Sequence, residues 1–536
     1  MPAPLFLIGF MASGKSTVGR TLASATGRRF LDLDDLIADM GEPVASLVAR
    51  DEAEFRRREA AALASVIDDG GSGLVIATGG GAAAFGDNLR RMRAAGLVIA
   101  LGVDVAEARA RASGGPARPL LANADDLAHR RAQHYRRAHA TIETTGSTVD
   151  GVVAQIQAVE RAWQRLPFAH RDATILPLGA RTYPIVTDER AIDGELVRTY
   201  VGDATKVVVI TDDTVYRHWH TTAIASLATI GAKVELISIP AGEASKSISQ
   251  YGALCEELVQ RGLDRGSALV AFGGGVVGDI TGYVAATLFR GIPFIQLPTT
   301  LVAMTDAAIG GKTAVDLAAG KNLVGAFWQP RLVACGLETL STLPARERRA
   351  GFGELWKYAL LDGETLWNLV DSCASWAAGQ QSSDDSPALP PALTEVIERS
   401  IAYKAAIVGR DERELTGHRA LLNLGHTVGH AIESASGLHH GEAVGLGLVA
   451  ACRVSAAVVG GPAGLESEVV RALQRTGLPA DLDPYLTDDV LDRIKVDKKR
   501  IGDKVRFVAI REVGACDPVE ITVTDLRRIL RPVSAA

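Results

Sequence analysis

The chain has 536 residues, of which 47% are hydrophobic and 22% are charged, and its formal net charge is -6. Single hydrophobic cores usually stop growing at roughly 250–300 residues, so this length predicts two or three domains. The composition is that of a globular protein, not of a disordered one. The acidic balance gives no basic footprint for nucleic acid, and no apolar run has the length of a membrane span. We therefore expect small-molecule substrates, with neither nucleic acid nor membrane as a partner.

The five cysteines are scattered along the chain, and no two of them form a CxxC pair. This pattern argues against a disulfide framework or a zinc ribbon and predicts a reducing compartment, the cytoplasm. The N-terminal stretch MPAPLFLIGF lacks a basic leader and runs into a Gly-rich loop. It therefore predicts a buried strand instead of a targeting segment.

Short apolar strands alternate with helical patterns over residues 1–164. The predicted strands include PLFLIGF, LVIAT and GLVIALGV, and a helix is expected to begin at Lys15. This alternation is typical of a parallel α/β sheet with crossover helices. The next segment, RLPFAHRD (165–172), has no clear periodicity, so we interpret it as a linker.

Beyond the linker, strands and helices alternate again before the pattern changes. KVVVITD, KVELISI and ALVAFGGG predict strands of a second α/β lobe that spans residues 173–340. From 341 to 536 the pattern becomes mainly helical, with a polar, Pro-containing loop at GQQSSDDSPALPP (379–391). No internal repeat is visible, and the two halves resemble separate proteins joined end to end.

The first predicted strand is followed by GFMASGKS (9–16), which fits the phosphate-loop pattern GxxxxGK[ST]. In such a loop the backbone N–H groups cradle phosphates, Lys15 supplies a cation to them, and Ser16 can hold Mg²⁺. A strand before the loop and a helix after it are the context that such a site requires. The sequence therefore predicts a nucleotide-triphosphate site in the first block.

Further motifs identify the class of phosphate acceptor. FLDLDD places Asp32 and Asp34 at alternate positions of an expected extended segment, so that both side chains point the same way. EFRRREA, TGGGA, ARPLL and RAQHY follow in that order. Together these motifs resemble shikimate kinase across nearly all of residues 1–160. A small polyhydroxylated acid needs bidentate arginines for its carboxylate and an aspartate for its hydroxyls, which agrees with this resemblance.

The resemblance to shikimate kinase implies roles for individual residues. ATP and Mg²⁺ are expected at Gly9, Gly14, Lys15, Ser16, Thr17, Asp32 and Arg111. Shikimate is expected at Asp34, Arg56, Gly79, Gly80, Gly81 and Arg131. Catalysis is expected from Asp34, Lys15 and Arg118, because phosphoryl transfer depends on positioning and charge neutralisation. Ala12 stands where many relatives carry an additional glycine, which restricts the backbone of the loop without removing a phosphate-binding group.

The second block contains a Gly-rich turn and a group of histidines. Gly273, Gly275 and Gly278 satisfy GxGxxG, but the acidic residue that normally follows about 20 positions later is missing. The stretch LLNLGHTVGHAIESASGLHHGEAVG holds four of the eleven histidines. From spacing alone, His426 and His430 lie four apart on a predicted helix and could bind one zinc ion together.

Several long motifs of the second block are similar to those of 3-dehydroquinate synthase. They are GEASKS, GGGVVGD, the run LPTTLVAMTDAAIGGKTAVDLAAGKNLVGAFWQP, GFGELWKYALLDG, YKAAIVGRDERE and RALLNLGHTVGH. The resemblance extends from about Ala173 to the C-terminus. It implies a two-lobed synthase, with an α/β nucleotide-binding lobe and a mainly helical metal-binding lobe, that forms a homodimer.

The synthase resemblance also implies a set of functional residues. The metal, Zn²⁺ or Co²⁺, is expected on Glu354, His426 and His440 with one position open, which is typical of a catalytic zinc. NAD⁺ is expected at Asp212, Glu243, Lys246, Gly274, Gly275, Asp279, Thr299, Thr300 and Lys321. The substrate is expected at Asp306, Lys312, Asn322, Lys404, Arg419, Asn423 and His430. Catalytic roles are expected for His430, Lys312, Lys357 and Asn423, and none for His439.

The implied reaction converts 3-deoxy-D-arabino-heptulosonate 7-phosphate into 3-dehydroquinate and phosphate, with NAD⁺ returned unchanged. Alternatives are another sugar-phosphate cyclase with NAD and zinc, or a polyol dehydrogenase that accumulates NADH. The first block could instead be a non-catalytic module that senses shikimate or nucleotide. Five positions depart from the family pattern and are expected to tune packing and affinity: Ala307, Ala308, Asp316, Leu317 and Trp328.

Overall fold

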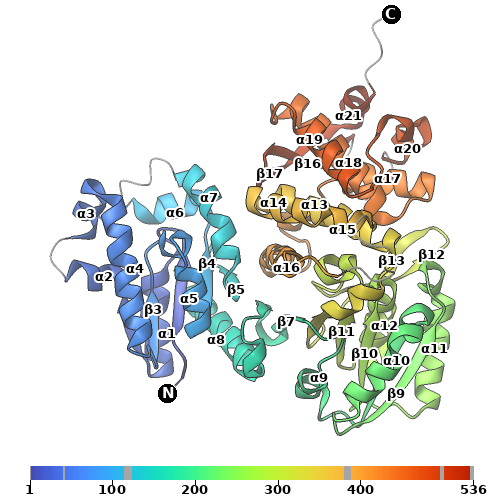
Figure 1. The fold of residues 1–536 in the computed structure, drawn as a ribbon, viewed down its shortest axis with the longest axis horizontal. Coiled ribbons are helices and arrows are strands. Elements are labelled where there is room, and N and C mark those ends of the chain that lie inside the picture. Colours follow the sequence, from blue (N-terminus) through green and yellow to red (C-terminus); the bar gives the residue numbers. More distant parts are fainter. Residues whose placement is uncertain are drawn as a thin grey trace, which may run out of the picture. The chain divides into compact units, whose positions relative to one another are not determined.

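A computed structural model describes residues 2–39, 43–113, 124–379, 388–494, 500–501 and 503–531. The chain divides into two compact units (Figure 1). The first comprises residues 1–186 and 405–410, and the second comprises residues 187–404 and 411–536.

The first unit is built on a five-stranded sheet with the order β2-β3-β1-β4-β5, in which all neighbours are parallel. Its strands are β1 (Leu5–Gly9), β2 (Arg29–Asp32), β3 (Leu74–Ala77), β4 (Leu97–Gly102) and β5 (Ala140–Glu143). Successive side chains of β1 enter different cores: Leu5 and Leu7 one core, Phe6 and Ile8 the other. Both faces of the sheet are therefore buried, as an all-parallel sheet requires.

Helices cover both faces of this sheet (Figure 1). They are α1 (Lys15–Thr26), α2 (Leu33–Ala38), α3 (Val44–Arg50), α4 (Glu52–Asp68), η1 (Ala82–Ala84), α5 (Asn88–Ala95), α6 (Val105–Ala112), α7 (Ala124–Arg136) and α8 (Val149–Arg165). Side chains of α1 and α8 share one core with β1, and side chains of α4 and α5 share the other. The predicted parallel α/β architecture of this block is confirmed.

The segment predicted as a linker follows α8 directly and includes η3 (Phe168–His170). Trp163 Nε1 donates a hydrogen bond to the Arg171 carbonyl at 2.7 Å, and Arg93 Nε donates to Asp172 Oδ1 at 2.7 Å. These contacts hold the segment against the rest of the first unit. The antiparallel pair β6 (Thr174–Leu176) and β7 (Tyr183–Asp188) follows, with η4 (Gly179–Arg181) between them.

The second unit begins with an α/β region whose parallel strands β14, β11, β10, β8 and β9 are neighbours in that order. Its strands are β8 (Lys206–Asp212), β9 (Lys233–Ile239), β10 (Ala268–Gly273), β11 (Phe294–Pro298) and β14 (Val333–Gly336). Its helices are α9 (Gly194–Val201), α10 (Asp213–Leu227), η5 (Glu243–Ser245), α11 (Ile248–Gln260), α12 (Gly275–Thr287), η6 (Leu288–Arg290), η7 (Ala303–Ala307) and η8 (Leu337–Thr342). A hairpin of β12 (Lys312–Leu317) and β13 (Gly320–Phe327) packs on α12.

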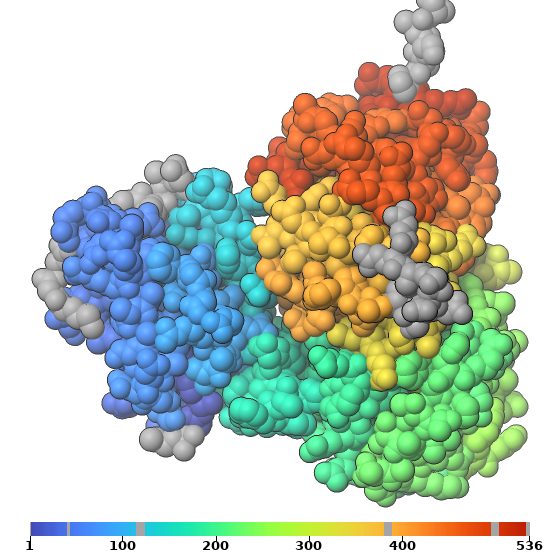
Figure 2. Space-filling model, in the orientation of Figure 1, coloured from blue at the N-terminus to red at the C-terminus, as the bar shows by residue number. Residues whose placement is uncertain are grey.

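The rest of the second unit is mainly helical, as predicted. Its helices are α13 (Ala345–Asp362), α14 (Glu364–Ser372), α15 (Ala374–Ala378), α16 (Leu393–Arg410), η9 (His418–Asn423), α17 (His426–Ser436), α18 (His440–Val458), α19 (Leu465–Arg475), η10 (Asp483–Tyr485), α20 (Asp488–Arg493) and α21 (Val523–Leu530), and the last residues of α16, 405–410, belong to the first unit. The sequence interpretation did not include an antiparallel sheet of β15 (Arg500–Ile501), β16 (Lys504–Glu512) and β17 (Ala515–Thr522). Figure 2 shows α13 to α15, in yellow and orange, packed against the orange and red helices that follow.

Helix α18 is long and apolar enough to cross a membrane, but most of it is buried inside the protein. It packs against α13, α17, α19, α21 and β16. We therefore interpret it as the central core helix of this region.

Candidate active sites

The phosphate loop of the first unit has the strand–loop–helix geometry that the sequence predicts. Strand β1 ends at Gly9 and α1 begins at Lys15, with Gly14 as N-cap at φ 91°. Lys15 Nζ donates to the carbonyls of Gly9 and Phe10 at 2.9 and 2.8 Å, and Ser16 Oγ donates to Asp32 Oδ2 at 2.6 Å. The loop thus brings a lysine, a hydroxyl and a carboxylate to the N-terminus of a helix, where phosphates bind favourably.

Ala12 adopts a left-handed backbone conformation in this loop, at φ 57°. A residue with a Cβ atom pays about 1–2 kcal/mol for that conformation, whereas glycine pays none. The departure from the family pattern therefore costs conformational energy at this position.

The expected extended arrangement of Asp32 and Asp34 is wrong. Strand β2 ends at Asp32, which is the N-cap of α2, and its Oδ1 accepts a hydrogen bond from the Asp34 backbone N–H at 3.2 Å. Asp34 lies in the first helical turn. Aspartate is among the preferred N-cap residues, and this local preference ended the strand earlier than the alternating pattern indicated.

The predicted shikimate residues gather around the glycine triplet after β3. An added Cβ would lie 3.2 Å from Asp34 Oδ1 if placed on Gly79, and 2.4 Å from Arg56 Nη2 if placed on Gly81. On Gly80 it would lie 3.6 Å from Arg131 Nη1. The triplet therefore lets these charged side chains approach the backbone closely, as a Gly-rich substrate loop requires.

Glu59 belongs to the same cluster and was missed by the sequence interpretation. It is fully buried, and its Oε2 accepts from Arg56 Nη1 at 2.6 Å. The signal was available, because Glu59 is the glutamate of the FRxxE motif. Burial raises the pKa of Glu59 although Arg56 opposes the shift, and burial together with Asp32 raises the pKa of Asp34.

Three predicted kinase residues remain to be placed, and the structure describes two of them. Arg111 donates to the Thr144 carbonyl at 2.8 Å and to the Ala12 carbonyl at 3.5 Å, so it reaches the phosphate loop. Thr17 is the third residue of α1. Arg118 lies outside the described residues.

In the second unit most of the predicted NAD residues follow the carboxyl ends of parallel strands, whereas Lys321 lies on β13 of the hairpin. Asp212 ends β8 and caps α10, and Gly274 lies between β10 and α12. Thr299 donates its backbone N–H to the Gly273 carbonyl at 3.0 Å, and the Lys246 ammonium pairs with the Asp279 carboxylate. This edge is where open α/β sheets bind nucleotides. Burial raises the pKa of Asp279 to about 6 although Lys246 opposes the shift.

Three departures from the family pattern have structural roles. Asp316 Oδ1 accepts from the Asn322 backbone at 2.7 Å, and Asn322 itself has φ 56°. Trp328 Nε1 donates to the Ile292 carbonyl at 3.0 Å. The Cβ of Ala307 lies 3.4 Å from the position that a Cβ on Gly275 would take, so Ala307 borders the start of α12. Asp316 and Trp328 thus make hydrogen bonds that support the hairpin and the segment after it.

A dense group of charges joins η7 to the helices α13 and α16. Asp306 Oδ1 accepts from Tyr358 at 2.7 Å, and lies 2.9 Å from Lys404 Nζ and 3.4 Å from Lys357 Nζ. Lys357 Nζ also lies 2.5 Å from Glu354 Oε2. Burial opposes the charge of Asp306, but the two lysines outweigh it and hold its pKa below its usual range. Burial lowers the pKa of Lys404 to about 8.

Other predicted substrate residues border this group. Lys312 and Arg419 both face Glu414 Oε1, at 2.5 and 3.7 Å, and Arg419 also donates to the Glu412 carbonyl at 2.6 Å. Asn423 ends η9, just before α17 begins. The sequence interpretation did not name Glu414.

Glycines bring the three helices that carry the metal-site residues almost into backbone contact. A Cβ on Gly441 would lie 1.7 Å from the Ala350 carbonyl oxygen, and a Cβ on Gly447 would lie 1.9 Å from that of Gly425. Only glycine permits such an approach. Helices α13 and α17 therefore both pack against α18, and Glu354, His426 and His440 converge.

The convergence leaves a place for a cation. Glu354 Oε1 lies 2.9 Å from His440 Nε2 and 3.3 Å from His426 Nε2. His426 Nδ1 faces the Leu424 carbonyl at 3.0 Å, and His440 Nδ1 faces a Glu433 oxygen at 3.0 Å. Every one of these ring nitrogens therefore faces an acceptor, and without a metal a protonated imidazole satisfies both of its contacts. When each ring is neutral with its proton on Nδ1, the two Nε2 lone pairs and Glu354 Oε1 face one another, an arrangement that a divalent metal satisfies.

Electrostatics support the same conclusion. Burial opposes a charge on His440, but its bonds to Glu354 and Glu433 outweigh burial and raise its pKa to about 10. Burial likewise opposes the charge of Glu354, yet Lys357 and His426 hold its pKa well below its usual range. The position between these groups thus favours positive charge.

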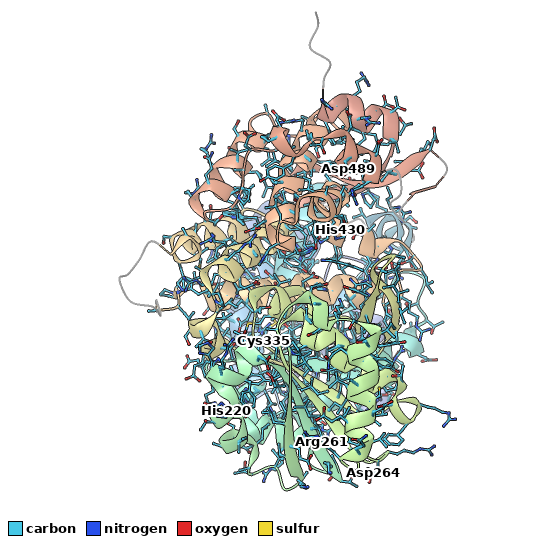
Figure 3. All side chains as sticks on the ribbon, turned by 90° about the vertical axis from the view of Figure 1, so that its right-hand side faces the viewer. His220, Arg261, Asp264, Cys335, His430 and Asp489 are labelled. Atoms are coloured by element: carbon cyan, nitrogen blue, oxygen red, sulfur yellow. The ribbon has the colours of Figure 1, made fainter. Side chains whose placement is uncertain are left out.

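His430 and His439 take different places. The ligand atoms of His426, His430 and His440 lie within 4.8 Å of one another, so His430 also borders the cation position. Figure 3 labels His430 on the helical side of the junction with the α/β region. His439 is the N-cap of α18, and its Nδ1 lies 3.2 Å from Glu347 Oε1. The His439 backbone N–H also donates to Glu442 Oε2 at 2.9 Å, so His439 caps α18.

The comparisons with known proteins agree with this geometry. Residues 236–350 match the N-terminal domain of 3-dehydroquinate synthase, and residues 351–500 match its C-terminal domain. The 3-dehydroquinate synthase of Caulobacter vibrioides is 42% identical over 348 residues, which cover 63% of this chain and 92% of that protein. The chain belongs to the 3-dehydroquinate synthase family. The enzyme of the same name from Latilactobacillus sakei is 41% identical, over 61% of this chain and 88% of its own length.

Residues 11–160 match shikimate kinase. The protein is thus a bifunctional enzyme of the shikimate pathway, with a shikimate kinase domain fused to the N-terminus of a 3-dehydroquinate synthase. The predicted activities are confirmed, and the interpretation of the first block as a non-catalytic module is not needed.

Solved structures of other cyclases share the fold of the second unit. A 2-deoxy-scyllo-inosose synthase, complexed with carbaglucose-6-phosphate, NAD⁺ and Co²⁺, is 26% identical with a TM-score of 0.59, over 67% of this chain and 99% of that one. The 2-epi-5-epi-valiolone synthase ValA of Streptomyces hygroscopicus, with NAD⁺ and Zn²⁺ bound, is 26% identical with a TM-score of 0.57, over 65% of this chain and 95% of that one. The sequence relatives at 41–42% identity decide between these activities in favour of the 3-dehydroquinate reaction.

Proposed function

We propose that Glu354, His426 and His440 hold one divalent metal ion in the synthase, and that His430 remains off the metal beside the open position. The supporting observation is that the Nε2 atoms of both histidines face one oxygen of Glu354, with their Nδ1 atoms occupied by acceptors. Two nitrogens and one oxygen suit Zn²⁺ or Co²⁺. When bound, the metal supplies Lewis-acid polarisation of a substrate hydroxyl and of the carbonyl derived from it.

The dinucleotide binds at the carboxyl ends of β8, β10 and β11. Asp212, Glu243, Lys246, Gly274, Gly275, Asp279, Thr299, Thr300 and Lys321 form its site. The Gly-rich start of α12 allows backbone N–H groups to approach the pyrophosphate. NAD⁺, when bound, supplies a hydride acceptor that is restored within each turnover.

Charged side chains of the second unit bind the anionic groups of 3-deoxy-D-arabino-heptulosonate 7-phosphate. Lys312, Lys357, Lys404 and Arg419 supply the cations, and Asp306, Asn322 and Asn423 orient the hydroxyls. Lys357 is fully buried beside both Glu354 and Asp306, so it holds a fixed positive charge next to the reacting carbon. His430 is exposed at the rim and moves a proton toward the leaving phosphate.

In the kinase, Lys15 and Arg111 neutralise the phosphates of ATP, while Ser16 and Asp32 hold Mg²⁺. Arg56 and Arg131 bind the carboxylate of shikimate beside Gly79, Gly80 and Gly81. Asp34 accepts the proton of the attacking hydroxyl, and Arg118 completes the charge neutralisation.

The synthase assignment is tested by supplying the full chain with 3-deoxy-D-arabino-heptulosonate 7-phosphate and a trace of NAD⁺. Many phosphates released per NAD⁺, abolished by a chelator and restored by Zn²⁺, is the expected result. Accumulation of NADH in proportion to phosphate would contradict the recycling of the cofactor. Phosphate release that survives complete metal removal would contradict the metal assignment.

We also propose that the protein forms a homodimer through its synthase half and that it lies in the cytoplasm. All five cysteines are free, three of them buried, which fits reducing surroundings. Equilibrium sedimentation of the full chain tests the dimer.

A further inference from the structure

Glu433 of α17 joins two parts of the synthase and was not identified from the sequence. One carboxylate oxygen, Oε2, lies 3.0 Å from Nδ1 of His440, and the other, Oε1, lies 2.7 Å from Nζ of Lys321. Its side chain is only 14% exposed. Both oxygens are therefore engaged, each with a residue of a different functional group.

The contact with His440 determines which imidazole nitrogen can bind a metal. A neutral imidazole carries one proton, and it can donate a lone pair to a metal only from the other nitrogen. With a metal bound, the Glu433 carboxylate accepts a hydrogen bond from Nδ1–H, which leaves the lone pair of Nε2 directed toward the position beside Glu354. Metal-binding histidines are commonly oriented in this way by a carboxylate or carbonyl behind the ring.

The other histidine of the site is oriented differently. Nδ1 of His426 faces the Leu424 backbone carbonyl at 3.0 Å, so its tautomer is fixed by the main chain. For His440 the same function depends on one side chain. A single substitution can therefore remove the support of one ligand and leave the other intact.

Lys321 holds Glu433 in place and extends the chain of contacts. Its ammonium lies 2.7 Å from Glu433 Oε1 and 3.7 Å from Glu243 Oε1, in the segment that we assign to the nucleotide. Lys321 belongs to β13 and Glu243 to η5, whereas Glu433 and His440 belong to α17 and α18. The contacts Glu243–Lys321–Glu433–His440 thus run from the nucleotide segment to the metal ligands.

We propose that Glu433 is a positioning residue that fixes the tautomer and orientation of His440, and that Lys321 holds Glu433 in the geometry this requires. The proposal rests on the assignment of His440 as a metal ligand. It predicts that metal affinity depends on two side chains that do not touch the metal.

The test uses the full chain, stripped of metal and titrated with Co²⁺ while its d–d absorption is recorded. Glu433→Ala is expected to weaken Co²⁺ binding by about 10- to 100-fold and to alter the saturated spectrum. Glu433→Gln keeps an acceptor oxygen and should lose less affinity. Lys321→Met should also lose less, because Glu433 keeps its contact with His440 but is no longer held by a cation.

Two controls separate positioning from folding. Glu520→Gln removes an exposed ion pair with Lys504, at 3.2 Å in the β16–β17 hairpin, and should bind Co²⁺ like the wild type. The melting temperature of the metal-free synthase should be similar in all variants, and the kinase activity of the same chain reports that the protein is intact.

The outcomes distinguish this proposal from the metal assignment. Unchanged Co²⁺ affinity and spectrum in Glu433→Ala would overturn the role of Glu433 while leaving the metal site in place. If the His440→Ala variant bound Co²⁺ with the affinity and spectrum of the wild type, the metal site itself would be overturned, and the proposal with it.

Discussion

The two catalytic units handle buried charge in different ways. In the kinase, Asp34 Oδ1 and Glu59 Oε1 are buried without a hydrogen-bond partner among the described residues. In the synthase, Asp306 is surrounded by Tyr358, Lys357 and Lys404 at 2.7–3.4 Å. The kinase site thus keeps two carboxylate oxygens without a hydrogen bond to a described residue, although Arg56 pairs with the other oxygen of Glu59. In the described part of the synthase Glu354 Oε2 also lacks a hydrogen bond, but it lies 2.5 Å from the Lys357 ammonium, so the charges there are paired with one another.

This difference indicates what each site gains from its ligands. A buried polar atom without a partner costs free energy, so shikimate hydroxyls or water at Asp34 would satisfy an existing need. Buried charges that are paired are costly to break one at a time, because removing one partner leaves the other charged and uncompensated. We therefore expect the kinase to be completed by its substrate, and the synthase to be preformed except for its metal and cofactor.

The largest effect should come from Glu354→Gln in the synthase. The substitution removes the one carboxylate that faces both histidines, so Co²⁺ or Zn²⁺ binding should fail and phosphate release should fall by at least on the order of 10³-fold. The measurement is phosphate release from 3-deoxy-D-arabino-heptulosonate 7-phosphate in Zn²⁺-saturated protein.

The kinase activity of the Glu354→Gln protein is its matched control, since both sites share one chain. Shikimate phosphorylation should be unchanged. Loss of both activities would show that the two units do not function independently.

Lys15→Met is the reciprocal experiment in the kinase. Lys15 is expected to stabilise the phosphates of ATP, so shikimate-dependent ADP formation should fall on the order of 10³-fold. Phosphate release by the synthase should stay at the wild-type rate. A kinase that retains most of its activity would contradict the assignment of the phosphate loop as its ATP site.

Much of the fold and of the two candidate sites could be predicted from the sequence, because their motifs are contiguous in the chain and adopt local structures. The phosphate loop, with Lys15 at a helix start, is one example. Glu433 could not be predicted in this way, since its role arises from contacts with Lys321 and His440, residues on other elements. Asp34 was assigned the wrong local structure because the capping preference of Asp32 overrode the alternating pattern. The predicted domain limits at residues 164 and 173 stay predictions.

Asp34→Asn removes a buried carboxylate of the kinase site and so tests the difference between the two sites in unpaired charge. As a base, Asp34 contributes about 10²–10⁴-fold to phosphorylation, and the variant should lose that factor. Burial raises the pKa of Asp34 in the folded state, so its contribution to stability is present at low pH and is lost as the pH rises through the folded value. The variant should therefore melt at a higher temperature than the wild type at neutral pH, and this difference should shrink in acid.

Activity and melting measured on the same samples separate the two effects of Asp34. A variant that is inactive and less stable at neutral pH would indicate that Asp34 is a structural partner, not a buried charge awaiting a ligand. Ser16→Ala provides a comparison, because it removes a neutral group beside Asp32 and should not stabilise the protein.

The smallest effect concerns pH in the synthase. Burial lowers the pKa of Lys404 to about 8, while Asp306 opposes the shift and Arg419 and Lys357 add to it. The charged form is needed to bind an anionic substrate, so kcat/KM should fall as the pH rises through 8, approaching tenfold per pH unit.

The stability of the synthase should show the opposite trend. Between pH 8 and the higher pKa of Lys404 in the unfolded chain, the unfolded state binds more protons, so the free energy of unfolding should rise with pH. In Lys404→Arg the guanidinium stays charged, and both trends should disappear. If kcat/KM of Lys404→Arg still fell above pH 8, another group would cause that fall. The paired cluster around Asp306 would then not control substrate binding through Lys404.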